Sequence, residues 1–298
     1  MNRSGTLRSY VAVDDQQTLL GHAALKFYHP HDPVAEAGVL FVNPAYRKKG
    51  IFDSIHRYLF KQASQENLAG LYSRAVTSHA LSQKKLHASG CAGCGLLLGL
   101  FPADVEFKKL TGKTAQKESA LLVFKAFNAS LRQIYPPKQH SNMIGDIFHH
   151  CEVPVTMKAP QVPTTQTDRH DEDCKLSYTL MDIFNTADIL CFSNDAAMAD
   201  EIFVATKRLC LERTDVLYLF LDLEQPGCDA LCEASEKMGF FFCGVLPFGL
   251  HGRHTLILQF LNNLAIDFAR IDLCDPFARQ VAAYVENSSR HHSTVALS

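Results

Sequence analysis

The chain has 298 residues, of which 47% are hydrophobic and 20% are charged, and its formal net charge is −2. This composition is typical of a folded globular protein and excludes a disordered chain, and the balanced charge without a basic stripe argues against nucleic-acid binding. No apolar run approaches the ~20 residues of a membrane-spanning helix, and MNRSGTLRSY lacks a signal-peptide core, so we expect a cytoplasmic protein without membrane contact whose ten Cys are reduced.

The first part of the chain alternates short apolar runs with turn residues. Two β-rich runs flank the polar turn DDQQ and predict a hairpin. A third apolar run, Gly38–Val42, predicts a buried strand that Asn43-Pro44 ends. From Gly50 the apolar spacing changes to three and four, which predicts an amphipathic helix to about Asn67. The elements predicted next are a strand GLYSRAV, a helix HALSQKKLHAS capped by Thr77 or Ser78 and ended by Gly90, and strands CGLLLGLF and SALLVFKAF.

The second half of the chain partly repeats this order. The elements predicted there are a strand ADILCFS, a helix NDAAMADEIFVATKRLCLERT capped by Asn194 or Asp195, a strand DVLYLFLDL, a short helix CDALCEASEKMG ended by Gly239, and strands FFFCGVLP and HTLILQFL. Both halves therefore share the order strand, long helix, strand, short helix, Gly and strand. We predict an α/β fold of the α+β kind, with mixed, mostly antiparallel sheets flanked by helices.

Composition also suggests where the domains end. Residues 159–173 are rich in Pro and polar residues and predict a flexible loop or linker. We predict a first domain over residues 1–128, a second over 129–270, and a C-terminal helix with a disordered tail over 271–298.

A basic stretch separates the third predicted strand from the first predicted helix, in the sequence FVNPAYRKKGIF. A helix N-terminus leaves main-chain N–H groups unpaired and carries partial positive charge. A phosphate fits there, especially where Gly lets the main chain come close. Arg47, Lys48 and Lys49 supply charge and Gly50 supplies the approach. The alternative interpretation is a solvated basic turn in which Gly serves only the turn geometry.

This stretch resembles the pyrophosphate-binding motif of the GNAT acyltransferase superfamily, Arg/Gln-x-x-Gly-x-Gly/Ala, whose ligand is acyl-coenzyme A. The matching residues run from Arg47 to Phe52, and Phe52 stands where a small residue is usual. The resemblance implies a tandem GNAT-like N-acyltransferase fold that binds acetyl-CoA or another acyl-CoA. The cofactor-binding residues that it implies are Phe41, Val42, Arg47, Lys48, Lys49, Gly50, Ile51, Phe52 and His79.

The resemblance continues into the second predicted helix, where the family pattern is Asn-x-x-Ala-x-x-x-Tyr-x-x-x-Gly-Phe. Here His79 takes the Asn position, Leu86 takes the Tyr position, and Gly90 matches. The family Tyr is often the general acid that protonates the coenzyme thiolate, and Leu cannot donate a proton. The acid would then be His79, His87 or the thiol of Cys91.

A general base is also needed, because an acceptor amine must lose a proton to attack a thioester. Many family members keep a carboxylate near the strand Gly38–Val42, and Glu36 lies just before it. The alternative for Glu36 is a solvated residue at a strand edge. We predict no metal site, since the spacing Cys91-Ala92-Gly93-Cys94 has no second pair of ligands to complete it.

The second half resembles the family only in its ending, where Gly239-Phe240 follows a helix and precedes a strand. No phosphate motif precedes Asn194, and Asp195 and Asp200 at the predicted helix start would repel phosphate. We therefore interpret this half as a degenerate copy that kept the fold and lost the cofactor site.

Two functional hypotheses follow. The first is an acyl-CoA-dependent N-acyltransferase that acts on an amine of a small molecule or a protein. The second is a non-catalytic GNAT-like module that binds CoA or a protein partner; Phe52 and Leu86 favour it. The stretches AVTSHALSQ, GFFFCGVLP and LILQFLNN resemble GNAT-like modules fused to anti-sigma-type ATPase domains, so such an ATPase, or a second copy of the chain, is a candidate partner. A nucleotide-phosphate enzyme is disfavoured, because its phosphate loop would carry several glycines.

Overall fold

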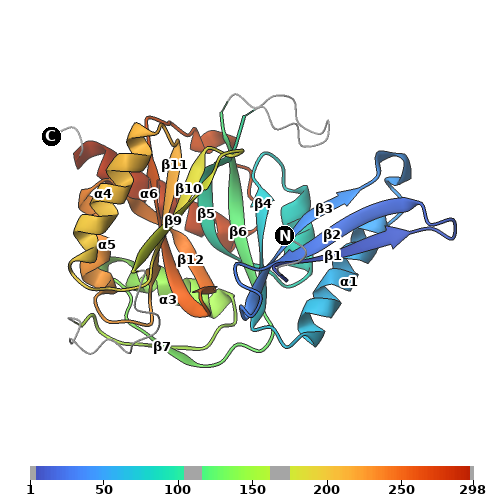
Figure 1. Cartoon of the computed structure of the whole chain (residues 1–298), viewed down its shortest axis with the longest axis horizontal. Coiled ribbons are helices and arrows are strands. Elements are labelled where there is room, and N and C mark those ends of the chain that lie inside the picture. Colours follow the sequence, from blue (N-terminus) through green and yellow to red (C-terminus); the bar gives the residue numbers. More distant parts are fainter. Residues whose placement is uncertain (1–4, 104–115, 162–174, 296–298) are drawn as a thin grey trace.

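A computed structural model of the chain describes residues 5–103, 116–161 and 175–295. These residues form an 11-stranded sheet in the order β1-β2-β3-β4-β6-β5-β12-β13-β11-β10-β9 and a separate two-stranded sheet, β7-β8 (Figure 1). The strands of the first half are β1 (Leu7–Val13), β2 (Leu19–Lys26), β3 (Val34–Val42), β4 (Gly70–Val76), β5 (Ala92–Phe101) and β6 (Glu118–Ala126). Those that follow are β7 (Arg132–Ile134), β8 (Val155–Met157), β9 (Leu176–Met181), β10 (Thr186–Cys191), β11 (Val216–Asp222), β12 (Phe241–Leu250) and β13 (Arg253–Leu261). The helices are α1 (Ile51–Gln65), α2 (Leu81–Ala88), α3 (Ser141–His150), α4 (Met198–Leu211), α5 (Cys228–Lys237) and α6 (Pro276–Val295).

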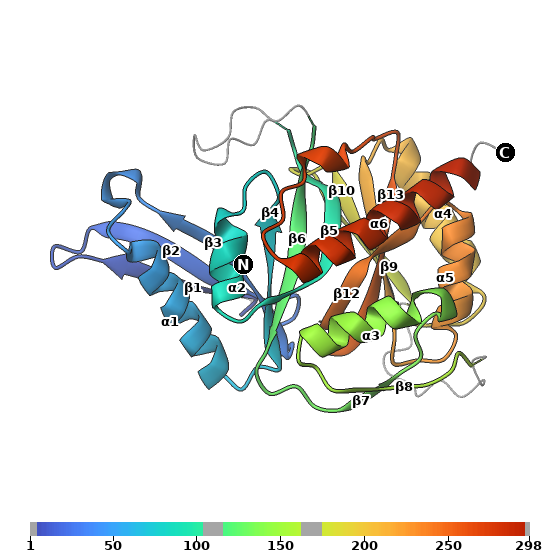
Figure 2. The same cartoon turned by 180° about the vertical axis from the view of Figure 1, so that it is seen from behind.

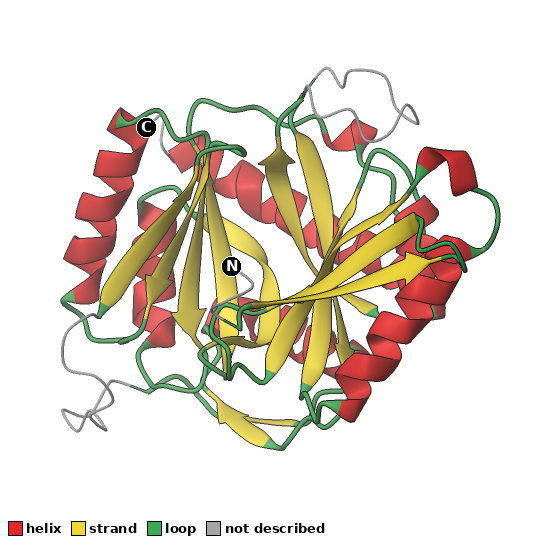
Figure 3. Ribbon diagram, turned by 45° about the vertical axis from the view of Figure 1, so that its right-hand side comes forward, coloured by secondary structure: helices red, strands yellow, loops and turns green. Residues whose placement is uncertain are grey.

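The mixed α/β architecture predicted from the sequence is confirmed, with one difference: the two halves share a single sheet. Their strands follow equivalent orders on the two sides of the β5–β12 junction. The sheet bends at this junction, and the helices lie on its outer side (Figures 2 and 3). The two half-sheets pack against each other on the inner side, where Tyr28 Oη donates a hydrogen bond to Asp188 Oδ2 at 2.9 Å and Tyr218 Oη donates to the Leu98 carbonyl at 3.0 Å.

Helix α1 forms because its apolar residues recur at helical spacing. Ile55, Leu59 and Ala63 lie on one face and are buried against β2 and β4, where Leu25 and Leu71 belong to the same apolar cluster. Ile55 and Leu59 each contribute about 1.5–3 kcal/mol when they are fully buried. This packing fixes α1 on the outer face of the sheet and places its first turn just after β3.

The prediction of a buried strand over Gly38–Val42 was wrong in two respects. Strand β3 begins earlier, at Val34, before the predicted start at Gly38. Its later half is not buried, since Val39 is 57% exposed and Phe41 is 38% exposed. A buried strand and an exposed strand can have the same apolar pattern. Only the position of the neighbouring strand determines whether such a run is covered.

The predicted helix caps were also wrong. Helix α2 begins after Ala80 and α4 begins after Ala197, and neither has a side-chain cap. Thr77 instead donates to Glu118 at 3.0 Å, and Asn194 donates to the main-chain carbonyls of Asp222, at the end of β11, and of Gln225. Tertiary hydrogen bonds thus engage two of the side chains that were expected to cap helices.

The C-terminal helix is confirmed as α6, but residues 162–174, which hold most of the predicted linker, and residues 296–298, at the predicted disordered end, lie outside the described part of the chain. Among the helices of the described residues, none is long and apolar enough to span a membrane.

The junction between the half-sheets depends on two glycines. Gly95 of β5 lies opposite Gly244 of β12, and a Cβ added to Gly244 would lie 2.3 Å from the Gly95 Cα atom. In both strands the pairing register shifts at the residue before this Gly. A positive φ recurs four residues later in each, at Gly99 (62°) and Phe248 (56°). The two junction strands therefore share an unusual local geometry.

We expect Gly244→Ala to lower the free energy of unfolding by about 1–3 kcal/mol, because the added methyl group has no room between the main chains. Urea unfolding followed by circular dichroism measures this change. Gly38→Ala is the matched control, since its Cβ would meet atoms no closer than 3.7 Å. Equal stability of the two variants would contradict the described junction.

Candidate active site

Strands β3 and β4 run parallel but separate early. They pair only over Val34–Glu36 with Gly70–Tyr72, although β3 continues to Val42 and β4 continues to Val76. Beyond this point β3 pairs with β2, and β4 pairs with β6. The strands therefore diverge toward their carboxyl ends, which is where α1 and α2 begin.

A β-bulge at Val39 shapes the diverging part of β3. The register with β2 shifts there, Val39 has a φ of 49°, and its carbonyl accepts a hydrogen bond from His22 Nδ1 at 2.9 Å. The Asn43 N–H donates to the Leu20 carbonyl of β2 at 2.8 Å. Because successive N–H groups of a strand point to opposite edges, the Phe41 N–H also points toward β2. The Val42 N–H points to the other edge, toward β4.

The start of α1 is open. Gly50 is its N-cap residue with a φ of 75°, and no side chain caps the helix. A Cβ added to Gly50 would meet no atom within 4 Å, and Arg47, Lys48 and Lys49 are exposed beside it. An anion can therefore reach the first N–H groups of α1 without displacing a side chain.

A groove of about 760 Å³ runs between α1 and α2. It begins in the first turn of α1 at Asp53, whose carboxylate lies 2.7 Å from Lys85 Nζ. Its base is Lys125 of β6, which donates to the Ser89 carbonyl. The groove is lined by Asp53, His56, Arg57, Phe60, Lys85, Ala88, Ser89, Gly90 and Lys125. Three of these residues are cations and one is an acid, so the groove favours an anionic ligand.

Sequence reasoning assigned none of the groove-lining residues to the site, and His56 is the one among them with a titratable aromatic ring. Its ring stacks on Phe52 at 5.9 Å and tilts on Phe60 at 4.4 Å, and its Nδ1 lies 3.5 Å from Ser89 Oγ. Its Nε2 has no hydrogen-bond partner in the part of the chain that the structure describes. Burial lowers the pKa of His56, with Asp53 opposing this shift, so the neutral ring is favoured. The spacing Phe52, His56 and Phe60 at i, i+4 and i+8 was the available sequence signal.

Glu36 lies at the last paired position of β3, where the divergence begins. Its carboxylate lies 3.4 Å from Arg74 Nε and 3.8 Å from Lys26 Nζ, and only 15% of its side chain is exposed. The structure thus places this candidate base at the expected end of the site but inside an ion-pair cluster.

The two candidate histidines are separated. His79 follows β4, and its Nδ1 is buried without a hydrogen-bond partner among the described residues. His87 does not line the groove: its side chain is 62% exposed, and its Nδ1 lies 3.8 Å from Asp275 Oδ1. Leu86 is buried in the core. Burial raises the pKa of the Cys91 thiol to about 12, so Cys91 is a weak acid.

The second half lacks these features. Strands β10 and β11 pair over the whole of Thr186–Cys191, with no divergence. The Asn194 side chain then donates to the carbonyls of Asp222 at 2.8 Å and Gln225 at 3.1 Å. The first turn of α4 carries two acids, Asp200 and Glu201. The start of α4 therefore carries acids where the start of α1 has the exposed cations Arg47, Lys48 and Lys49 beside it.

Residues 2–90 match the acetyltransferase (GNAT) family. Among solved structures, the chain is similar to the ribosomal-protein-S18-alanine N-acetyltransferase from Escherichia coli, with 13% identity and a TM-score of 0.35 over 42% of this chain and 72% of that one. It is also similar to spermidine N-acetyltransferase from Vibrio cholerae in complex with CoA and spermine, with 16% identity and a TM-score of 0.34 over 41% and 66% of the two chains. A nourseothricin acetyltransferase has 20% identity and a TM-score of 0.33 over 41% and 66%. No curated protein matches the chain.

Proposed function

Because residues 2–90 belong to the acetyltransferase (GNAT) family, we propose that the first half of the chain binds acetyl-CoA or another acyl-CoA and transfers the acyl group to an amine. The observation that carries this proposal is the divergence of β3 from β4 beside the uncapped start of α1. It provides an opening for the acyl end of a ligand and a neighbouring site for its phosphates. The acceptor is an amine of a small molecule or a protein.

The described residues suggest how the coenzyme would be held. The N–H groups of Ile51 and Phe52 would bind the pyrophosphate, with Arg47, Lys48 and Lys49 contributing charge. The groove between α1 and α2 would take the nucleotide end, since it combines the cations named above with the aromatic faces of His56 and Phe60. The Phe52 ring stacks on His56, so the residue that departs from the family motif would extend this aromatic surface.

At the reacting end, the Val42 N–H is the better placed of the two predicted main-chain donors, because it points toward the diverging strand. A donor directed at a developing negative charge stabilises the transition state of acyl transfer. The Phe41 ring stacks on His22, with 5.3 Å between the ring centroids.

Two proton transfers accompany the reaction. The attacking amine loses one proton, and the departing thiolate gains one. We assign the first proton transfer to Glu36, because it lies where β3 and β4 begin to diverge. We assign the second to His79, which follows β4 and whose Nδ1 has no partner among the residues that the structure describes. His87 is assigned no catalytic role, because it faces Asp275.

Calorimetry with acetyl-CoA tests binding, and release of CoA thiol across a panel of primary amines tests transfer. We expect binding to wild-type protein with an affinity that weakens as salt rises, since the site depends on exposed cations. Absence of binding at low salt would overturn the proposed function.

We expect Glu36→Gln to reduce thiol release by about 10²–10⁴-fold while acetyl-CoA binding changes less than about threefold, because a general base acts in the chemical step. The reduction should be smaller at high pH, where free amine is more abundant. Arg74→Gln is the companion variant, since it removes the ion-pair partner and keeps the carboxylate. Unchanged turnover in Glu36→Gln would show that Glu36 only holds the ion-pair cluster.

The alternative is a module that binds CoA or a protein partner without catalysis. It is favoured by Leu86, which replaces the family proton donor and lies in the core, and by the ion pairing of Glu36. Binding of acetyl-CoA without thiol release from any amine would support it. An ATPase of the anti-sigma type or a second copy of the chain would then be the partner to test.

We further propose that the second half is a degenerate copy of the first. Glu36 pairs with Tyr72 across β3 and β4, and Asp188 pairs with Tyr218 at the equivalent place across β10 and β11. The repeated geometry at the β5–β12 junction also supports a duplication. Full pairing of β10 with β11 and the acids of α4 support the loss of the cofactor site.

A further inference from the structure

A cluster of three buried side chains lies in the second half, outside the groove. His140 ends a short 3-10 turn (Lys138–His140), while Cys232 and Glu236 lie one turn apart on α5. One potential ligand atom from each lies within 4.8 Å of the other two. The side chains of His140 and Glu236 are 6% and 11% exposed, and Cys232 is fully buried.

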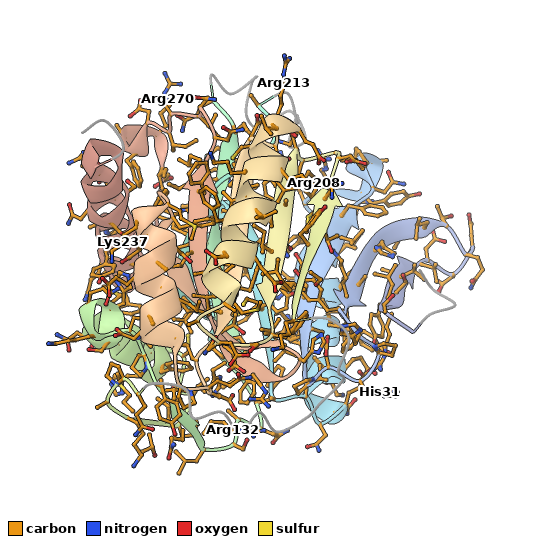
Figure 4. The ribbon with its side chains drawn as sticks, turned by 60° about the vertical axis from the view of Figure 1, so that its left-hand side comes forward. His31, Arg132, Arg208, Arg213, Lys237 and Arg270 are labelled. Atoms are coloured by element: carbon orange, nitrogen blue, oxygen red, sulfur yellow. The ribbon has the colours of Figure 1, made fainter. Side chains whose placement is uncertain are left out.

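The side chains of α5 show that the cluster faces the interior of the molecule. Lys237, the neighbour of Glu236, points away from the molecule (Figure 4) and pairs with Glu233 at 2.7 Å. Cys232 and Glu236 face the opposite way, toward the 3-10 turn and α6, which lie on the same side of the sheet (Figure 2). The cluster therefore joins the 3-10 turn to α5, and Tyr284 of α6 contacts it through His140.

The hydrogen bonds around His140 allow the tautomer that a metal ligand needs. Tyr284 Oη lies 3.1 Å from the Gln139 carbonyl and 2.8 Å from His140 Nδ1, and its single proton can serve only one of them. When Tyr284 donates to the carbonyl, it accepts from the His140 Nδ1–H, and Nε2 then presents a lone pair. Nε2 lies 2.7 Å from Glu236 Oε1.

In this tautomer a metal cation between Nε2 and Glu236 Oε1 would bind both atoms, and it would also bind the Cys232 sulfur, which lies within 4.8 Å of them. Gln139 closes a further side, since its amide lies 3.7 Å from Cys232 Sγ and 3.1 Å from Glu236 Oε2.

We propose that His140 Nε2, Cys232 Sγ and the Glu236 carboxylate bind a divalent transition metal of the zinc type. Thiolate, imidazole and carboxylate are the ligands that zinc takes in proteins. The contact from Nδ1 to Tyr284 is the outer hydrogen bond that commonly orients a metal-binding His. Binding releases the Cys232 proton to solvent. Two ligands at Zn bond lengths of roughly 2.0 Å lie about 3.3 Å apart, so His140 and Glu236 need only separate slightly.

The site has the closed character of a structural metal centre, because its ligands are buried and it links the 3-10 turn, α5 and α6. Sequence reasoning predicted no metal site, since His140 lies far from Cys232 and Glu236 in the chain. The spacing of Cys232 and Glu236, four residues apart on one helix face, was the only local signal.

Cobalt is the probe for this site, because a Co²⁺–thiolate bond gives a charge-transfer absorption that no oxygen or nitrogen ligand gives. The full-length chain is stripped with a chelator and titrated with Co²⁺ alone. We expect one equivalent to bind with the thiolate band, and Zn²⁺ to bleach the band. Cys232→Ser should remove it, and Tyr284→Phe should weaken Co²⁺ binding by about 10–100-fold.

Two further variants make the test decisive. Glu236→Gln can still donate a hydrogen bond to the Nε2 lone pair, so it should fold and yet lose tight metal binding. Cys228→Ser is the matched control, since Cys228 is equally buried on the same helix but outside the cluster, and it should keep the band. A folded wild-type chain without a thiolate band, or a band that survives Cys232→Ser, would overturn the proposal.

Discussion

Gly50→Val should weaken acetyl-CoA binding at least tenfold, which corresponds to about 1.4 kcal/mol. A β-branched residue is strained at a φ of 75°, and its side chain would enter the space through which a pyrophosphate approaches the N–H groups of α1. Because no side chain caps this helix, the ligand would bind the main-chain N–H groups themselves, and the variant would block them. Calorimetry of the wild type and the variant at the same ionic strength measures the difference.

The second half offers a matched control for this variant. Gly227 is the N-cap residue of α5, with a φ of 92° and no side-chain cap, so Gly227→Val imposes a comparable strain on a different helix start. We expect both variants to lose stability and only Gly50→Val to lose acetyl-CoA binding. Equal loss in both would show that the effect is general destabilisation and would remove the assignment of the pyrophosphate to α1.

His254 should lower protein stability as the pH drops below about 6.5. This residue is fully buried in β13, with its ring 4.8 Å from Phe148 and 4.4 Å from Phe248. The Phe248 N–H donates to its Nδ1 at 3.2 Å, so Nδ1 serves as an acceptor and the ring is neutral. Burial, aided by the charge of Arg132, lowers the pKa of His254 to about 3.

The sign of this effect follows from proton counting. The folded pKa of about 3 lies below the unfolded value, so between about pH 3 and about pH 6.5 the unfolded chain binds the extra proton. The contribution of neutral His254 is therefore complete above that range and declines as the pH falls. The slope is about 1.4 kcal/mol per pH unit and accumulates to about 5 kcal/mol by the lower limit. Asp222 works in the opposite direction, because burial raises its pKa to about 6.

His254→Asn isolates the histidine term. The Asn amide oxygen can accept the Phe248 N–H, and the side chain carries no titrating proton. The variant should be less stable at neutral pH, and its free energy of unfolding should lose the part of its pH dependence that one proton contributes. Urea unfolding from pH 7 to pH 4 measures both quantities. His149→Asn, at an exposed position, should keep the wild-type slope. A slope that is unchanged in His254→Asn would contradict the neutral buried ring.

Local pattern predicted the regular elements well where a single segment carries the signal. GLYSRAV coincides with β4, and the helix expected from Gly50 is α1, shorter by two residues than the predicted end at Asn67. Both predictions depend only on spacing along the chain and on the Gly that begins each pattern. The open start of α1 was equally accessible, because Gly50 and the absence of a nearby capping side chain are local properties.

Features that depend on partners were not predictable in this way. The early start of β3 at Val34 and its exposed second half depend on where β4 leaves it. The two halves join through Gly95 and Gly244, a contact between residues whose close approach no local pattern reveals. The place of His87 beside Asp275, rather than in the groove, likewise depends on how α6 packs near α2. In each case the neighbouring element determines the local structure, and the local sequence pattern does not encode where that element lies.

Hydrogen exchange with and without acetyl-CoA tests the central claim most directly, because it reports on both halves of the chain in one experiment. The proposed site predicts slower exchange of the main-chain N–H groups over residues 37–52, where β3 diverges and α1 begins. It predicts no change over residues 192–202, the equivalent stretch at the start of α4. Protection confined to the second stretch, or absent from both at saturating acetyl-CoA, would contradict the account.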